Sequence, residues 1–91
     1  MSVKAMAWAW EIEDLPVYEK LVLLYLAHRA GVSNRCWPGK ETIAAACGCS
    51  KRKVDYSLKA LADQGMIRIC HRQSDRGNIT NVYCVEVPEN T

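Results

Sequence analysis

The fold of this chain is decided by residues Lys40 to Gln64, KETIAAACGCSKRKVDYSLKALADQ, which at helical period predict two helices separated by a break. The first helix covers about Lys40 to Cys47 and places Ile43 and Ala44 on its apolar side. Gly48 follows, and glycine readily takes the positive φ that ends a helix. The chain can therefore turn sharply at this point.

The second helix begins after Ser50, whose hydroxyl can accept a hydrogen bond from an unpaired amide of the first turn. Val54, Leu58 and Leu61 then recur at i, i+4 and i+7 as one apolar stripe. Two helices that cross steeply need a small residue at their contact, which Ala44 supplies, and a sharp turn between them. This arrangement predicts a helix-turn-helix, whose second helix offers a basic amino-terminal end to a DNA groove.

The composition predicts one domain with one site. The 91 residues, 49% of them apolar, suffice for a single modest core, so we expect one domain over 1–91 with its core at about 14–87. Residues 1–34 carry a net charge of −1, residues 35–76 carry nine basic against four acidic side chains, and the tail carries −2. Positive charge gathered around the helix-turn-helix is expected for a face that meets phosphates, and it argues against a membrane-binding chain.

The chain has five cysteines, at positions 36, 47, 49, 70 and 84, and neither an export signal nor a membrane span. We therefore expect a cytoplasmic protein with free thiols and with no metal or cofactor. The alternative is a zinc site that adds His28 and His71. Zinc sites favour paired C-x(2-4)-C units, however, and the only close pair here is Cys47 and Cys49.

Residues 3–13, VKAMAWAWEIE, fit both a helix and a strand, because good helix formers also alternate with larger side chains. We favour a short helix that lays Trp8 and Trp10 over the core or over a partner chain. This extra N-terminal segment is the expected surface for self-association as a dimer or for contact with replication proteins.

Asp14 and Pro16 signal the start of the next helix, since aspartate caps helices and proline suits their first turn. The helix is apolar at every position from 21 to 27, which is typical of a central helix, and it should run to Ala30 and be closed by Gly31. His28 could be a ligand or a base. A hydrogen-bonded histidine at the edge of the core is the favoured interpretation.

Residues 31–39, GVSNRCWPG, contain turn formers and predict a loop that leads into the helix-turn-helix. Trp37 in this loop is expected to roof the core, because a tryptophan directly before a helix commonly does so. Stacking of its indole on a nucleic-acid base is the alternative.

A hairpin is predicted after Gly65, which ends the second helix of the motif. From Ile67 the apolar positions alternate with period two, residues 74–78 (SDRGN) predict a turn, and residues 79–87 (ITNVYCVEV) predict the returning strand. Tyr83, Val85 and Val87 share one side of that strand. A hairpin directly after a recognition helix is a wing, and its tip is expected to carry three polar side chains: Arg72, Arg76 and Asn78.

The chain resembles the winged helix-turn-helix domains of phage and plasmid replication initiators and related phage regulators, from about Asp14 to Val85. The matching positions are Lys20 to Ala27, Cys36-Trp37-Pro38, Thr42-Ile43-Ala44, Gly48-Cys49-Ser50, Val54, Leu58, Leu61, Gly65-Met66-Ile67, Asn81 and Tyr83. The resemblance implies an α+β, mainly α fold: a three-helix core plus a C-terminal β-hairpin wing, with the extra N-terminal segment. It departs at Gly39, where such domains often have a serine, and a glycine cap is weaker but tolerated.

The resemblance also implies that the helix after Ser50 enters the major groove of double-stranded DNA and that the hairpin contacts the backbone or the minor groove. The candidate DNA-binding residues lie on this helix, at the start of the helix before it, and in the hairpin: Lys40, Ser50, Lys51, Arg52, Lys53, Asp55, Tyr56, Lys59, Arg72, Arg76 and Asn78.

Two kinds of DNA contact are expected from these side chains. Phosphates would be held by Lys40, Lys53, Arg72 and the amides at helix starts. Bases would be read by some of Lys51, Arg52, Asp55 and Tyr56. Arg76 would enter the minor groove, where a narrow groove concentrates negative potential.

The predicted function is double-stranded DNA binding without catalysis, in a replication-initiation protein or its DNA-binding domain. One alternative is a transcriptional regulator of the same fold, and another is a winged-helix protein-interaction module that does not bind DNA. An enzyme is not expected, because the two histidines are far apart in sequence and no glycine-rich phosphate loop or nucleophile elbow is present.

Overall fold

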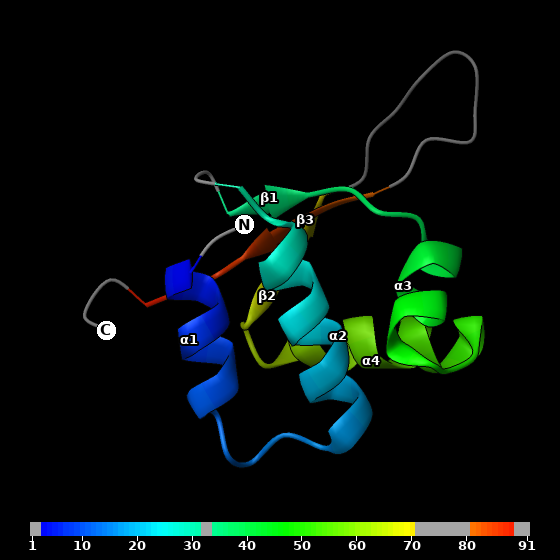
Figure 1. Ribbon diagram of the computed structural model, residues 1–91, viewed down its shortest axis with the longest axis horizontal. Coiled ribbons are helices and arrows are strands. Elements are labelled where there is room, and N and C mark those ends of the chain that lie inside the picture. Colours follow the sequence, from blue (N-terminus) through cyan, green and yellow to red (C-terminus); the bar gives the residue numbers. More distant parts are fainter. Residues whose placement is uncertain (1–2, 32–33, 71–80, 89–91) are drawn as a thin grey trace.

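The fold is four helices with a small antiparallel sheet, seen in a computed structural model that describes residues 3–31, 34–70 and 81–88 (Figure 1). The elements are α1 (Val3–Glu11), α2 (Val17–Arg29), β1 (Arg35–Cys36), α3 (Lys40–Cys47), α4 (Lys51–Asp63), β2 (Ile67–Cys70) and β3 (Val82–Val85). This order and content confirm the predicted α+β, mainly α class of a winged helix-turn-helix. No described helix has both the length and the apolar character of a membrane span.

Helix α2 is the centre of the molecule, as its apolar run predicts. It packs against α1, α3, α4 and the sheet (Figure 1). Val22, Leu23, Leu26 and Ala27 have no exposed surface, because neighbouring elements cover them from several sides. Leu21 lies outside this contact and is 38% exposed.

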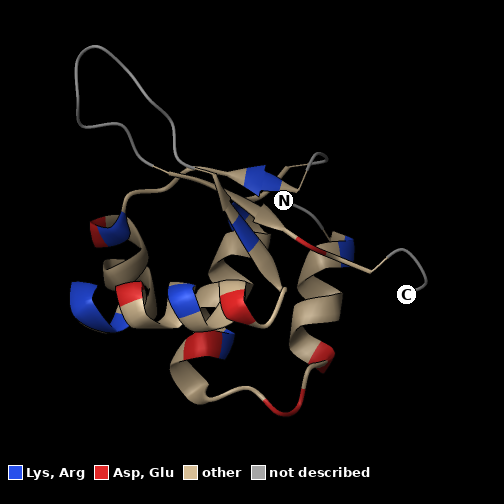
Figure 2. Cartoon of the chain, turned by 180° about the vertical axis from the view of Figure 1, so that it is seen from behind, with Lys and Arg blue, Asp and Glu red and all other residues tan. Residues whose placement is uncertain are grey.

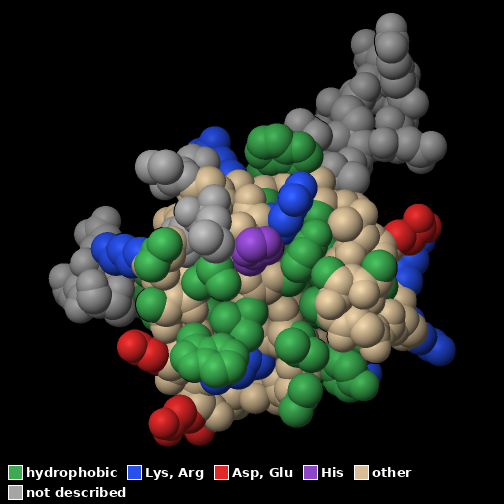
Figure 3. All heavy atoms as spheres, in the orientation of Figure 1, with side chains coloured by type: hydrophobic (Ala, Val, Ile, Leu, Met, Phe, Trp, Pro, Cys, Tyr) green, Lys and Arg blue, Asp and Glu red, His purple; other side chains and the backbone are tan. Residues whose placement is uncertain are grey.

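Helix α1 confirms that the N-terminal segment forms a short helix and not a strand. Its alanines Ala5 and Ala9 are fully buried against α2, since small side chains let two helices approach closely. Trp8 is partly buried against the core, whereas Trp10 is 68% exposed. Trp8 therefore lies over the core as expected, and for Trp10 the other expected position, over a partner chain, stays a prediction. Figure 3 shows hydrophobic side chains gathered over α1 and α2 on this face of the molecule.

Two predicted signals around α2 are not used as expected. The N-cap is Pro16 without a side-chain hydrogen bond, and Asp14 lies two residues further out, so Asp14 is not the cap. A proline carbonyl still accepts from Lys20 N at 2.9 Å, which satisfies the first turn. At its other end α2 finishes at Arg29, and the next residue, Ala30, has an extended conformation. Gly31 is therefore not needed to end the helix.

The helix-turn-helix has the predicted bounds and caps. Gly48 takes φ 67° and ends α3, and Ser50 Oγ accepts from the N–H of Lys53 at 3.1 Å at the start of α4. Gly65, at φ 75°, ends α4, and the N–H of Met66 donates to the carbonyl of Leu61 at 3.0 Å in the manner of a Schellman turn. Val54, Leu58 and Leu61 are buried, which confirms the predicted stripe.

The sheet contains one strand that the sequence does not reveal. The order is β1-β3-β2, with Arg35 opposite Cys84 and Ile67 opposite Val85. Residues 31–39 are therefore not a loop throughout, because β1 completes the sheet on the free side of β3. With partners on both sides, β3 buries Cys84 as well as Tyr83 and Val85, so its burial does not alternate.

The predicted wing is described only at its base. Strands β2 and β3 pair as the hairpin requires. The expected turn at 74–78, with Arg72, Arg76 and Asn78 around it, lies outside the described residues.

Candidate nucleic-acid interface

The first turn of α4 presents a group of cations to solvent. Lys51, Arg52 and Lys53 are all exposed there, while the next residue, Val54, is fully buried and fixes the helix against the core. In Figure 2 the blue ribbon that marks lysine and arginine positions covers this end of α4, beside α3. The Ser50 side chain accepts a hydrogen bond from the Lys53 amide of this turn. The positive end of the helix dipole adds to the charge of the side chains.

An open hollow of about 240 Å³ lies at this turn, lined by Ser50, Arg52, Lys53 and Tyr56. Tyr56 is 72% exposed, although it is a large aromatic residue. Lys53 Nζ stands 5.0 Å from the centroid of the Tyr18 ring, so a residue of α2 holds this ammonium at the edge of the hollow. The lining offers hydrogen-bond donors and an aromatic face, a combination suited to phosphates and base edges.

Lys40 and Asp55 join the start of α3 to α4. Lys40 Nζ donates to Asp55 Oδ1 at 2.6 Å, and Lys59 Nζ stands 3.9 Å from Asp55 Oδ2. The hydrogen bond from Lys40 lowers the pKa of Asp55 below its ordinary value, and the same bond raises the pKa of Lys40. Both groups therefore stay charged at neutral pH, and the pair braces the two helices.

The remaining cations of the first turn differ in their partners. Lys51 Nζ stands 3.4 Å from Glu41 Oε1 in an exposed pair. Neither Arg52 nor Lys53 forms an ion pair with any carboxylate of the described chain. These two side chains are therefore the ones whose charge is least compensated at the start of α4.

The structure brings most of the predicted site residues onto one surface. They lie at the start of α3 and along α4: Lys40, Ser50, Lys51, Arg52, Lys53, Asp55, Tyr56 and Lys59. The three hairpin residues, Arg72, Arg76 and Asn78, are outside the described part of the chain. Tyr18 joins this surface without having been predicted, because it belongs to α2 and no local pattern links it to Lys53.

The cysteines do not gather into a metal site within the described residues. Cys36 and Cys84 are buried, Cys47 and Cys49 are half-buried, and all carry free thiols. Burial raises the pKa of the Cys36 thiol to about 11, and burial also raises the pKa of Cys47. Both thiols are therefore protonated at neutral pH, a form that binds metals poorly.

Comparison with known proteins agrees with this geometry. A family model described as "Helix-turn-helix domain" matches residues 13–67, which span α2, β1, α3, α4 and the beginning of β2. No curated protein and no solved structure matches the chain. The matched range covers more than half of the 91 residues and contains the cationic first turn of α4. Membership of such a family supports binding to double-stranded DNA. The chain belongs to the helix-turn-helix domain family.

Proposed function

We propose that this domain binds double-stranded DNA by placing the first turns of α4 in the major groove. The observation that carries the proposal is the exposed run Lys51, Arg52 and Lys53 at the start of α4, in which Arg52 and Lys53 lack a carboxylate partner among the described residues. Recognition helices of this motif contact base edges with their N-terminal residues, and an α-helix fits the width of the major groove. The function is binding alone, with no catalytic step.

The surface divides into residues that position the domain and residues that contact bases. Lys40 and Lys53 flank the helix starts and would hold phosphates, Lys40 with the donors left over from its bond to Asp55. Arg52 is the strongest candidate for a base contact, since a guanidinium can bond both acceptors of a guanine edge. Lys51, Tyr56 and Lys59 lie on the same exposed side of α4 and complete the surface.

Asp55 and the hairpin have more particular roles in the proposal. Asp55 would accept from a cytosine amino group only by sharing oxygens that already face Lys40 and Lys59. Arg76, with Arg72 and Asn78 beside it, would contact the backbone or the minor groove. This assignment follows from the resemblance to winged domains and from the pairing of β2 with β3 at the base of the hairpin.

The biological role that we propose is replication initiation, on the resemblance to phage and plasmid initiators. Transcriptional regulation is the alternative use of the same surface. Selection of bound sequences from a random duplex library shows whether the domain binds as several monomers or as a dimer. Repeated direct sites indicate several monomers on an origin, and a palindrome indicates a dimer. The exposed Trp10 on α1 is the proposed contact for self-association or for a replication partner.

Titration of labelled duplex DNA at several salt concentrations tests the proposal. The wild type should bind, and its affinity should fall steeply with salt because phosphate binding releases counterions. Arg52→Ala should weaken binding, whereas Arg68→Ala should not, since Arg68 lies on β2 and pairs with Glu86 at 3.3 Å. A domain that serves only as a protein-interaction module would show no steep salt dependence.

A further inference from the structure

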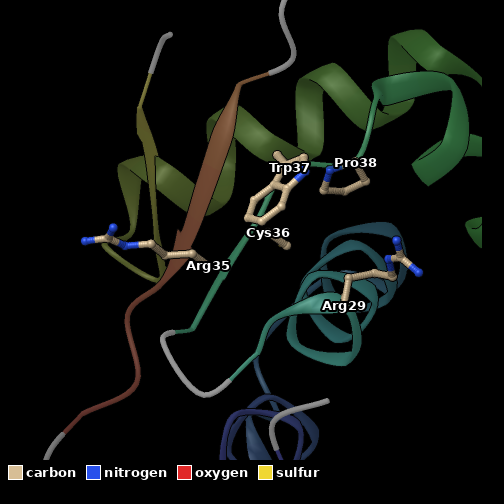
Figure 4. Close-up of a pocket in the computed structure, with 5 residues that line it drawn as sticks. All are labelled: Arg29, Arg35, Cys36, Trp37 and Pro38. Carbon is tan, nitrogen blue, oxygen red and sulfur yellow. The ribbon is translucent and has the colours of Figure 1, made fainter.

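A second surface lies between the end of α2 and the start of α3. It is a hollow of about 140 Å³ lined by Arg29, Arg35, Cys36, Trp37 and Pro38 (Figure 4). Trp37 was expected to roof the core, but it is 59% exposed. The reason is that Cys36 takes the inward position, with its Sγ 3.5 Å from the carbonyl oxygen of Leu26, and successive side chains of an extended segment point to opposite sides.

The exposed indole is flanked by two arginines. Arg29 comes from the end of α2 and Arg35 from β1, and Figure 4 shows them on opposite sides of Trp37 with their guanidinium groups directed apart. Neither forms an ion pair with a carboxylate anywhere in the described chain. The Trp37 ring is therefore not closely packed, and the two arginines beside it have no described carboxylate partner. Neither feature is explained by a role in the domain's own structure.

This arrangement matches the chemistry of a nucleic-acid strand. A base can stack on an indole because every base has a π face, and guanidinium groups on either side can contact the phosphates that precede and follow that base. The bases of a duplex are stacked on one another, so an indole on the protein surface reaches a base face only where the strand is unpaired.

We propose that Arg29, Trp37 and Arg35 form a contact for single-stranded nucleic acid, with a base stacked on Trp37 and its neighbouring phosphates held by the two arginines. This surface precedes α3, and none of its residues belongs to the proposed duplex-binding surface on α4. The domain can therefore hold an unpaired strand with one surface and a duplex with the other. The two activities do not depend on each other and can be tested separately.

The test uses the full chain and a short dye-labelled oligothymidylate, which cannot form a duplex with itself, in fluorescence anisotropy at low salt. Trp37→Ala should weaken binding by about five- to a hundredfold, the range for loss of one stacked base. Trp37→Phe should keep most of the affinity, since the aromatic face remains. Arg35→Gln should reduce the salt slope by about 0.7, as expected when one phosphate contact to a single strand is lost.

The matched control is Val17→Ala, because Val17 is an exposed apolar side chain on α2 that belongs to neither proposed nucleic-acid surface. It should leave the affinity for oligothymidylate unchanged, and Trp37→Ala should leave the affinity for duplex DNA unchanged. Melting temperatures of all variants establish that they are folded. The proposal is overturned if the wild type does not bind the oligonucleotide, if Trp37→Ala and Val17→Ala have equal effects, or if Trp37→Ala weakens duplex binding as much as single-strand binding.

Discussion

Arg52 is the residue whose environment most favours contact with a base. It is exposed at the first turn of α4, lines the hollow with Ser50, and forms no ion pair with a described carboxylate. We expect Arg52→Ala to lose about 1–3 kcal/mol of binding free energy on the preferred duplex and much less on random DNA, because a base contact is made only at the right base. Dissociation constants on both duplexes measure the difference. Equal losses on the two duplexes would make Arg52 a phosphate contact and move base recognition to Lys51, Asp55, Tyr56 or the hairpin.

Asp55 connects the protonation of one carboxyl to the stability of the motif. Its pKa is lowered from 3.8 by the hydrogen bond from Lys40, so the pair stabilises the fold above pH 3.8 and this contribution is lost as pH falls through the lower folded-state value. Asp55→Asn should therefore lower the melting temperature at neutral pH, and the difference from wild type should shrink in acid. Asp63→Asn, on the same helix and without an ion pair to a described residue, is the control. A difference that stayed constant between neutral and acidic pH would mean that packing, and not the charge, is responsible.

At the scale of elements, α4 is held to the core by its buried stripe. Leu61 has no exposed surface, and truncation of a fully buried leucine leaves a cavity. We expect Leu61→Ala to reduce the free energy of unfolding by about 2–5 kcal/mol in denaturant titration. Leu21→Ala removes the same atoms from a side chain that is 38% exposed on α2 and should have a clearly smaller effect. A small effect of Leu61→Ala would show that the helix phase is wrong.

The turn between α3 and α4 depends on backbone conformation and not on space. Gly48 has φ 67°, and a Cβ built there meets no atom within 4 Å. Gly48→Ala should therefore cost only the left-handed backbone conformation of an L-residue, about 1–2 kcal/mol of unfolding free energy. Gly31 also has open space but no positive φ, so Gly31→Ala should stay within about 0.5 kcal/mol of wild type. If chemical denaturation gave equal losses of unfolding free energy for the two variants, the positive φ would not explain why a glycine occupies position 48.

The helix-turn-helix could be predicted from the sequence because its signals are local. Gly48, Ser50 and the spacing of Val54, Leu58 and Leu61 each act within one or two helical turns. Strand β1 could not be predicted, since two residues carry no period and the strand exists only through its pairing with β3. Asp14 illustrates the opposite error, because a residue with good capping chemistry is not used when the chain enters the helix at Pro16.

The same limit applies to the candidate site. The cations of α4 could be named from the sequence, because they lie opposite the apolar stripe of one helix. The bond between Lys40 and Asp55 and the contact between Lys53 and Tyr18 could not, since each joins residues of different helices. The outward position of Trp37 follows from the burial of Cys36, a residue of β1, against Leu26 of α2, which is a consequence of tertiary packing.

Over the whole molecule, positive charge is concentrated in the segment that contains the helix-turn-helix. Residues 1–34 carry a net −1, whereas residues 35–76 carry +5, yet α1 also bears an exposed lysine, Lys4. A cation near bound phosphates contributes to counterion release, and a cation on a remote helix contributes little beyond the Debye length of about 10 Å at 0.1 M salt. Position on the surface, and not the total charge, should therefore decide the salt dependence.

Lys53→Ala and Lys4→Ala remove one positive charge each and so test this arrangement directly. For Lys53→Ala we expect the slope of log affinity against log salt on duplex DNA to fall by about 0.9, because Lys53 is held beside Tyr18 at the edge of the hollow on α4. Lys4→Ala should leave the slope unchanged. Duplex titrations at several salt concentrations give both slopes. Equal reductions would mean that DNA responds to the net charge of the domain, and the assignment of α4 as the binding surface would fail.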